Sequence, residues 1–153
     1  MSHTLIESVA ASVVQLFALL TDPLRIPEWM PGCDSVHCQT PLRKGARFTA
    51  RFGRRETEFE VVDFAPPATF GWVERGQRHG WKTFFRLDTT PLATAVTIRT
   101  VWIPRSFGAS LRARFFEKRS ARQQLTMILA NLRRILAPDA APVGDAEDNS
   151  ATG

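Results

Sequence analysis

Tyrosine is absent from the chain, and only two of its 153 residues are cysteines. Without a phenol, one common proton donor and oxyanion-stabilising group is missing from any active site. Cys33 and Cys38 lie five positions apart on a predicted strand, where their side chains would point to opposite faces, so no disulfide is expected between them. With His37 they form C-x3-H-C, which is not a usual metal-binding spacing, and we expect neither a metal nor a cofactor.

Segments that would indicate a compartment or a reaction are also missing. No apolar run approaches the roughly 20 residues that span a bilayer, and the N-terminus lacks the basic and apolar parts of a signal peptide. There is no glycine-rich phosphate loop, the stretch from Ser106 to Ser110 is not a nucleophile elbow, and no recognisable nucleic-acid-reading motif is present. We therefore expect a cytoplasmic protein with no transmembrane segment and no specific nucleic-acid partner.

Length and charge divide the chain into a body and a tail. With 44% hydrophobic and 23% charged residues, the composition is that of an ordinary globular protein, and the length predicts one domain, residues 1–137. The remaining segment, 138–153, has four acidic residues, no basic residue and no aromatic residue, so we expect it to be disordered. The net charge of +5 is thus the sum of −4 in the tail and +9 in the body.

The first third of the body predicts a strand followed by two short helices. The strand is expected at 3–9 and the first helix at 13–21, where Ser12 and Gln15 match a capping box that satisfies free backbone amides at the helix start. The second helix is expected at 23–29, with a proline in its first turn.

Alternating apolar and polar residues then predict a run of strands. Phe48, Ala50 and Phe52, for example, share one face of their strand. Connections of hairpin length favour an antiparallel meander with one apolar face. The predicted strands are 34–40, 47–53, 56–64, 69–74, 81–88 and 93–103.

A long helix at 106–136, bounded by two prolines, supplies a cover for the apolar face of the sheet. Its second half carries an apolar stripe within about 60° of Leu125 on a helical wheel. The stripe consists of Ala121, Leu125, Ile128, Leu129, Leu132 and Leu136.

The same wheel brings three cations of the first half, Arg114, Lys118 and Arg122, onto the stripe. Cations that face a low-dielectric pocket would predict an anionic ligand head group. Alternatively, the helix kinks or starts late near Ser120, so that the cations face water and one of two phenylalanines, Phe115 or Phe116, packs inward. The sequence leaves both arrangements open.

Four stretches carry a resemblance to a known family. They are 9–32 (VAASVVQLFALLTDPLRIPEWMPG), 41–52 (PLRKGARFTARF), 59–72 (FEVVDFAPPATFGW) and 93–102 (ATAVTIRTVW). In this order they resemble the START/Bet v 1-like (SRPBCC) superfamily, and within it the polyketide cyclase/dehydrase-like branch. The resemblance implies an α+β helix-grip fold, in which a seven-stranded antiparallel sheet curls around the long C-terminal helix and two short helices follow the first strand. It also implies a hydrophobic cavity between sheet and helix.

Candidate site residues follow from the inward faces of the predicted strands and from this implied cavity. Aromatic walls are typical of small-molecule pockets, but the same side chains could simply fill the core. The candidate ligand-binding residues are Trp29, Phe48, Phe52, Phe59, Trp72, Trp81, Phe85, Trp102, Arg114, Lys118 and Arg122. No catalytic set is assigned; the candidates are Glu74 and Arg114, although Glu74 beside Arg75 at a strand end is more typical of a surface ion pair.

Binding of a small hydrophobic molecule (lipid-, polyketide- or aromatic-like) in the implied cavity is the function that the sequence favours, and an anionic head group would explain the cations. A polyketide cyclase or aromatase of the same fold is the first alternative. The second is an interaction module for an anionic macromolecule, which the arginine-rich helix suggests. Phe116 and Met127 lie opposite the apolar stripe, which adds the hypothesis of a homodimer.

Overall fold

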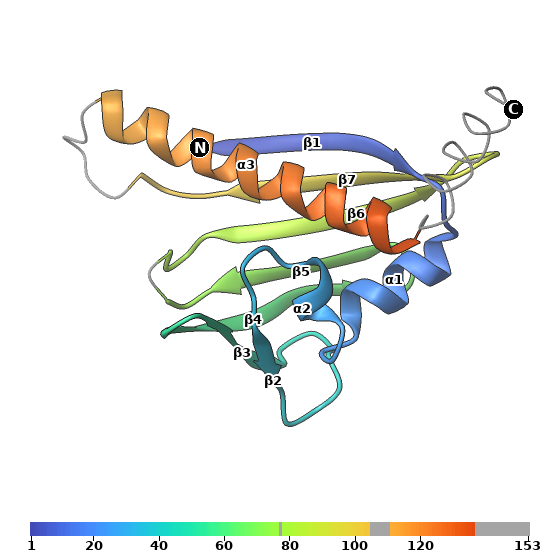
Figure 1. Ribbon diagram of the computed structural model, residues 1–153, viewed down its shortest axis with the longest axis horizontal. Helices are drawn as coiled ribbons and strands as arrows, with labels where there is room; N and C mark the ends of the chain where they lie inside the picture. The colour runs from blue at the N-terminus through green and yellow to red at the C-terminus, as the bar shows by residue number, and fades with distance from the viewer. Residues whose placement is uncertain (77, 105–110, 137–153) are drawn as a thin grey trace, which may run out of the picture.

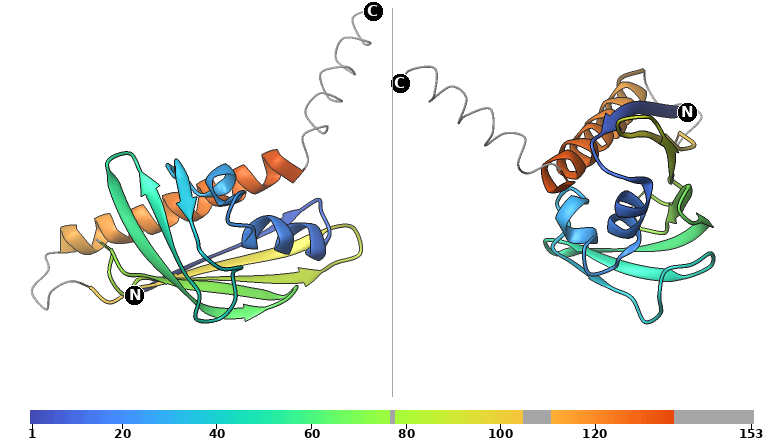
Figure 2. Two further views of the ribbon diagram at one scale, coloured as in Figure 1. Left: turned by 90° about the horizontal axis from the view of Figure 1, so that it is seen from below. Right: turned by 90° about the vertical axis from the view of Figure 1, so that its right-hand side faces the viewer.

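A seven-stranded antiparallel sheet curls around one long helix in the computed structural model, which describes residues 1–76, 78–104 and 111–136 (Figures 1 and 2). The strand order is β1-β7-β6-β5-β4-β3-β2, so β2 to β7 form the predicted meander and β1 pairs with β7. The elements are β1 (Ser2–Val9), α1 (Val13–Thr21), α2 (Ile26–Trp29), β2 (Ser35–His37), β3 (Arg47–Phe52), β4 (Arg55–Ala65), β5 (Thr69–Glu74), β6 (Lys82–Thr89), β7 (Thr94–Val101) and α3 (Leu111–Leu136). The predicted α+β helix-grip fold is confirmed.

Local signals in the sequence explain the first two helices. Ser12 accepts a hydrogen bond from the backbone of Gln15, whose side chain accepts one from the backbone of Ser12, so the predicted capping box is confirmed. The second helix begins at Ile26 rather than at residue 23, because Asp22 closes a turn in which its side chain accepts the backbone N–H of Leu24.

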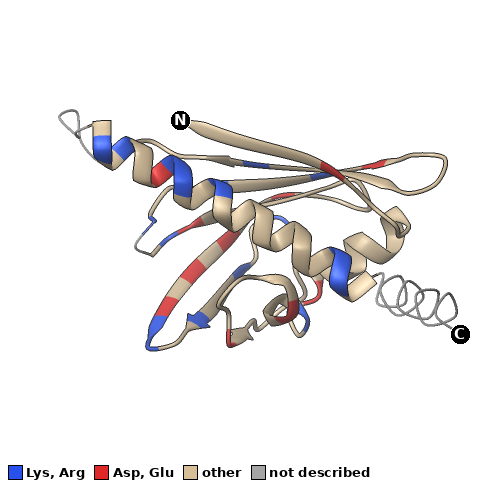
Figure 3. Ribbon diagram, turned by 45° about the horizontal axis from the view of Figure 1, so that its top comes forward, with Lys and Arg blue, Asp and Glu red and all other residues tan. Residues whose placement is uncertain are grey.

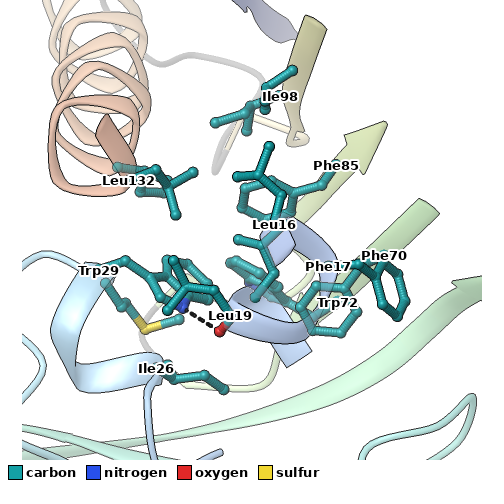
Figure 4. Packing of buried hydrophobic residues seen from close by; sticks show 14 of the residues in the cluster. Leu16, Phe17, Leu19, Ile26, Trp29, Phe70, Trp72, Phe85, Ile98 and Leu132 are labelled. Carbon is teal, nitrogen blue, oxygen red and sulfur yellow. Dashed lines mark hydrogen bonds between the residues drawn. The ribbon is translucent and has the colours of Figure 1, made fainter. Parts of the chain in front are cut away.

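The two small helices and the sheet enclose an aromatic core. Trp29 at the end of α2 is fully buried, and its indole N–H donates to the carbonyl of Leu19 in α1 at 3.1 Å (Figure 4). Its ring lies 6.0 Å from that of Trp72 on β5 and 5.7 Å from that of Phe85 on β6. Trp29 therefore fastens both helices to the concave face of the sheet.

The two halves of α3 have different environments. Ala121, Leu125, Ile128, Leu129 and Leu132 are buried against the sheet, as the apolar stripe predicts. The second half is fixed further by hydrogen bonds from Asn131 to the carbonyl of Trp29 and from Arg133 to the carbonyl of Ser8.

The first half of α3 extends beyond this core. The helix is continuous from Leu111, and Phe115 and Phe116 are exposed, so neither phenylalanine packs inward. Arg114, Lys118 and Arg122 are exposed as well. A helical wheel shows in which direction these side chains point, but it does not show how far the sheet extends along the helix. In the structure, full burial on α3 begins only at Ala121. The predicted helix start at residues 106–110 and the predicted tail lie outside the described residues.

Candidate functional site

The aromatic residues predicted to line a cavity mostly pack against one another. Phe48 and Phe59 stack with ring centroids 4.9 Å apart, and Trp81 and Trp102 stack at 4.8 Å in a separate small cluster with Ala121. The rings of Trp29, Trp72 and Phe85 contact one another in the main core. Phe52 and Phe59 are the members of the predicted aromatic set that line a pocket between sheet and helix in the described part of the chain. Most of these rings therefore pack in the hydrophobic core and do not line a cavity.

This pocket lies where β4, β5 and the β5–β6 turn face the end of α2 and the middle of α3. Its volume is about 230 Å³, which is below the roughly 300–1,000 Å³ of typical drug-sized ligand sites. We name it the Glu74 pocket. It is lined by Met30, Pro31, Phe52, Arg55, Thr57, Phe59, Glu74, Arg78, Ser120, Gln123, Gln124 and Met127.

Glu74 is the buried charged residue of this pocket. It is the last residue of β5, its exposed fraction is 7%, and Phe59 lies opposite it in the strand register. Among the described residues its carboxyl has no hydrogen-bond or ion-pair partner. Burial raises the pKa of Glu74 to about 7, although the positive charges of Arg78 and Arg55 oppose the shift. At neutral pH the protonated and ionised forms of this carboxyl are therefore populated about equally.

The expected surface pair between Glu74 and Arg75 is wrong. Arg75 points to the other side of the sheet and pairs with Glu60 on β4 at 3.4 Å. Successive residues of a strand alternate between its two faces, so neighbours in sequence do not pair here. The backbone N–H of Glu74 donates to the carbonyl of Trp81, which holds this residue at the base of the turn.

Arg78 joins the β5–β6 turn to α3. Its guanidinium donates to Gln124 Oε1 and to Ser120 Oγ, and it lies over the ring of Trp81 with its central carbon 4.6 Å from the centroid. These oxygens are neutral, so the positive charge of Arg78 is not balanced by an ion pair within the described chain. A guanidinium has five N–H groups, and these two bonds leave others free to donate into the pocket.

Trp72 carries a buried donor without a partner, although it does not line the Glu74 pocket. It lies two residues before Glu74 on the same face of β5 and is 1% exposed, yet its indole N–H has no acceptor among the described residues. Buried indole N–H groups normally have a hydrogen-bond acceptor, because a buried donor without one costs roughly 1–3 kcal/mol. Within the pocket itself, Arg78 and the protonated form of Glu74 are hydrogen-bond donors, so the site is suited to an oxygen acceptor.

Sequence reasoning missed Thr57, Arg78 and the polar side of α3. One signal was available: Ser120, Gln123 and Gln124 form a polar cluster at the edge of the apolar stripe. The predicted cations lie elsewhere. Lys118 and Arg122 line an outer groove of about 490 Å³ with His3, Phe115, Arg119 and Gln123. Arg114 lines neither pocket, which corrects the hypothesis that these three cations share the inner site.

Metal ligation has no support in the part of the chain that the structure describes, where no three His, Cys, Asp or Glu residues form a cluster. Cys33 and Cys38 are free thiols, and burial raises the pKa of Cys33 to about 11. None of the helices described is long and apolar enough to cross a bilayer.

Comparison with known proteins supports the fold. A family model described as "Polyketide cyclase / dehydrase and lipid transport" matches residues 4–135. The di-domain ARO/CYC StfQ from the steffimycin biosynthetic pathway is similar over 92% of this chain and 51% of its own, with 14% identity and a TM-score of 0.73. The Aha1 dimer from Colwellia psychrerythraea is similar over 89% of this chain and 96% of its own, with 18% identity and a TM-score of 0.68. A comparison with curated protein sequences found no match.

Proposed function

This chain belongs to the polyketide cyclase/dehydrase and lipid transport family, and from that membership we propose that it binds a small, largely apolar molecule with an acceptor oxygen in the Glu74 pocket. The observation that carries the proposal is Glu74: the residue is 7% exposed, it lines the pocket, and its carboxyl has no hydrogen-bond or ion-pair partner within the described chain. An uncompensated buried polar group is costly, and a ligand that pairs with it recovers that cost.

The dimensions of the pocket limit the ligand to about one ring. An apolar cavity of about 150 Å³ holds benzene, so the 230 Å³ here leave room for a ring with one substituent. Phe52, Phe59 and Met127 offer apolar contacts to such a ring. The size of the cavity does not support a long acyl chain or a multi-ring sterol in this arrangement of side chains.

The polar wall sets the chemistry of the substituent. Arg78 donates hydrogen bonds and has no ion-pair partner within the described chain, and the protonated form of Glu74 donates as well. Both groups would bind a carbonyl, and Arg78 would bind a carboxylate more strongly. Aryl ketones and aryl carboxylates are therefore the ligand classes that we propose.

Replacing Arg78 by glutamine should weaken the binding of benzoate by about 10- to 100-fold, the usual effect of losing one hydrogen bond to a charged group. Arg75→Gln is the matched control, because Arg75 lies in the same hairpin and pairs with Glu60 outside the pocket. Calorimetric titration of wild type and both variants measures the three affinities. Equal affinities of the two variants, or no saturable binding of benzoate or acetophenone to the wild type, would remove support for this site.

The alternative of a cyclase or aromatase would use the same pocket. Glu74 could then give its proton to a ligand carbonyl and regain one from the attacking enol as the carbon–carbon bond forms, leaving its own protonation state unchanged. A substrate would have to occupy the pocket before any reaction, so binding is the simpler proposal. The calorimetric titration with benzoate tests binding.

A further inference from the structure

The first half of α3 presents cations and large apolar side chains on one exposed surface. We define the α3 patch as Leu111, Arg112, Phe115, Phe116, Arg119 and Arg122. At 100° per residue these six side chains fall within an arc of about 140°. Leu111 is 85%, Phe115 63% and Phe116 56% exposed, which is unusual for side chains of this size.

The charge of this surface has one sign. Figure 3 shows lysines and arginines along the first half of α3, and Glu117 is the only acidic residue between Leu111 and Leu136. The carboxylate of Glu117 accepts a hydrogen bond from the indole of Trp102 at 3.1 Å, which directs it toward the sheet and away from the patch. Two further exposed cations, Arg114 and Lys118, flank the patch. No ion pair within the described chain neutralises these arginines and lysine.

We propose that the α3 patch docks the protein on an anionic lipid surface. A helix that carries phenylalanine and leucine among arginines lies at the boundary of lipid head groups and acyl chains, where both kinds of side chain are satisfied. The rings of Phe115 and Phe116, with centroids 6.4 Å apart, would enter this boundary while the arginines contact phosphates. This inference does not rest on the proposed ligand, because none of the six residues lines the Glu74 pocket.

The same observations argue against two other partners. A second copy of this chain would bring two sets of like charges together across a symmetric contact, which is unfavourable. Nucleic acid would neutralise the arginines but would leave Leu111 without an apolar partner. An anionic bilayer is the partner that satisfies both the charge and the apolar area.

Flotation of the full-length protein with lipid vesicles tests this proposal. We expect binding to phosphatidylcholine vesicles that contain about 30% phosphatidylglycerol and much weaker binding to phosphatidylcholine alone, because each cation near an anionic surface contributes about a fivefold gain in affinity. Arg112→Glu with Arg119→Glu should lower the affinity for anionic vesicles by more than about tenfold. Phe115→Ser with Phe116→Ser should lower it by a similar factor through lost apolar burial.

Matched variants separate the patch from general charge and hydrophobicity. Arg43→Glu with Lys44→Glu makes the same charge change on an exposed loop, and Leu92→Ser removes a side chain that is 95% exposed on another turn. Both controls should bind vesicles as the wild type does, and circular dichroism should show the same fold for every variant, since all the replaced side chains are exposed.

Three results would overturn the proposal. The first is equal loss of binding in the patch and control variants, which would show an effect of net charge only. The second is a higher affinity for a duplex oligonucleotide than for anionic vesicles, with the affinity for the oligonucleotide unchanged by the two phenylalanine replacements. The third is a wild-type protein that does not float with anionic vesicles. This result would overturn the proposal also if light scattering showed that the protein self-associates and so covers the patch.

Discussion

Replacing Glu74 by glutamine should raise the free energy of unfolding by about 3 kcal/mol at a pH of about 8 and by less than about 1 kcal/mol at a pH of about 5. The pKa of Glu74 in the folded protein is about 7, above the 4.5 of the free carboxyl. Between these two values the folded state binds more protons than the unfolded state. The contribution of Glu74 to stability is therefore complete below the unfolded pKa and is lost as the pH rises through the folded pKa.

Glutamine has the same shape and never ionises, so this loss is absent in the variant. Urea denaturation of both proteins at several pH values between about 5 and 8 measures the difference. Glu56→Gln, at an exposed position of β4, is the control and should change stability by less than about 0.5 kcal/mol throughout. A constant difference between wild type and Glu74→Gln across this pH range would show that Glu74 is not held in a buried, neutral form.

Leu132→Ala should destabilise the protein by about 2–5 kcal/mol, whereas Leu111→Ala should change stability by less than about 0.5 kcal/mol. Both replacements make the same chemical change in the same helix, and alanine preserves helix propensity at each position. Leu132 is fully buried in the main core, and Leu111 is 85% exposed. Denaturation of the two variants at one pH compares them directly. Similar costs at both positions would contradict the division of α3 into a packed half and an exposed half.

Most of the fold could be predicted because it depends on local periodicity. Strand alternation, the capping box at Ser12 and the apolar stripe around Leu125 are all visible within short windows of sequence. The errors fall at element ends. The strand predicted at 34–40 is only Ser35–His37, since β2 is an edge strand that pairs with β3 over those positions alone.

The candidate site was less predictable because its parts meet only in three dimensions. Alternation from Phe70 and Trp72 already implied that Glu74 faces inward, and the adjacent Arg75 obscured that signal. Arg78 lies in a turn, where periodicity gives no direction, and its partner Gln124 is 46 residues away in the chain. No window of sequence shows that contact.

The cations of α3 illustrate a second limit. A helical wheel gives the direction of Arg114 relative to Leu125, but not how far the sheet extends along the helix. Side chains beyond the end of a packed core are exposed whatever stripe they occupy, which is the situation of Arg114 and Lys118. Arg122 is exposed as well, although it follows the buried Ala121. Aromatic residues show a related limit, because alternation identified the inward rings without showing that they fill most of the interior.

The methyl NMR spectrum of methionine-labelled protein tests the proposed ligand site most directly. The chain has three methionines; Met30 and Met127 line the Glu74 pocket, and Met1 at the N-terminus does not. Titration with benzoate and acetophenone should shift the methyl signals of Met30 and Met127 in a saturable way, and Arg78→Gln should weaken the response to benzoate. The signal of Met1 should stay in place. Shifts of all three signals in proportion to added compound, or shifts of Met1 alone, would contradict a ligand site at Glu74.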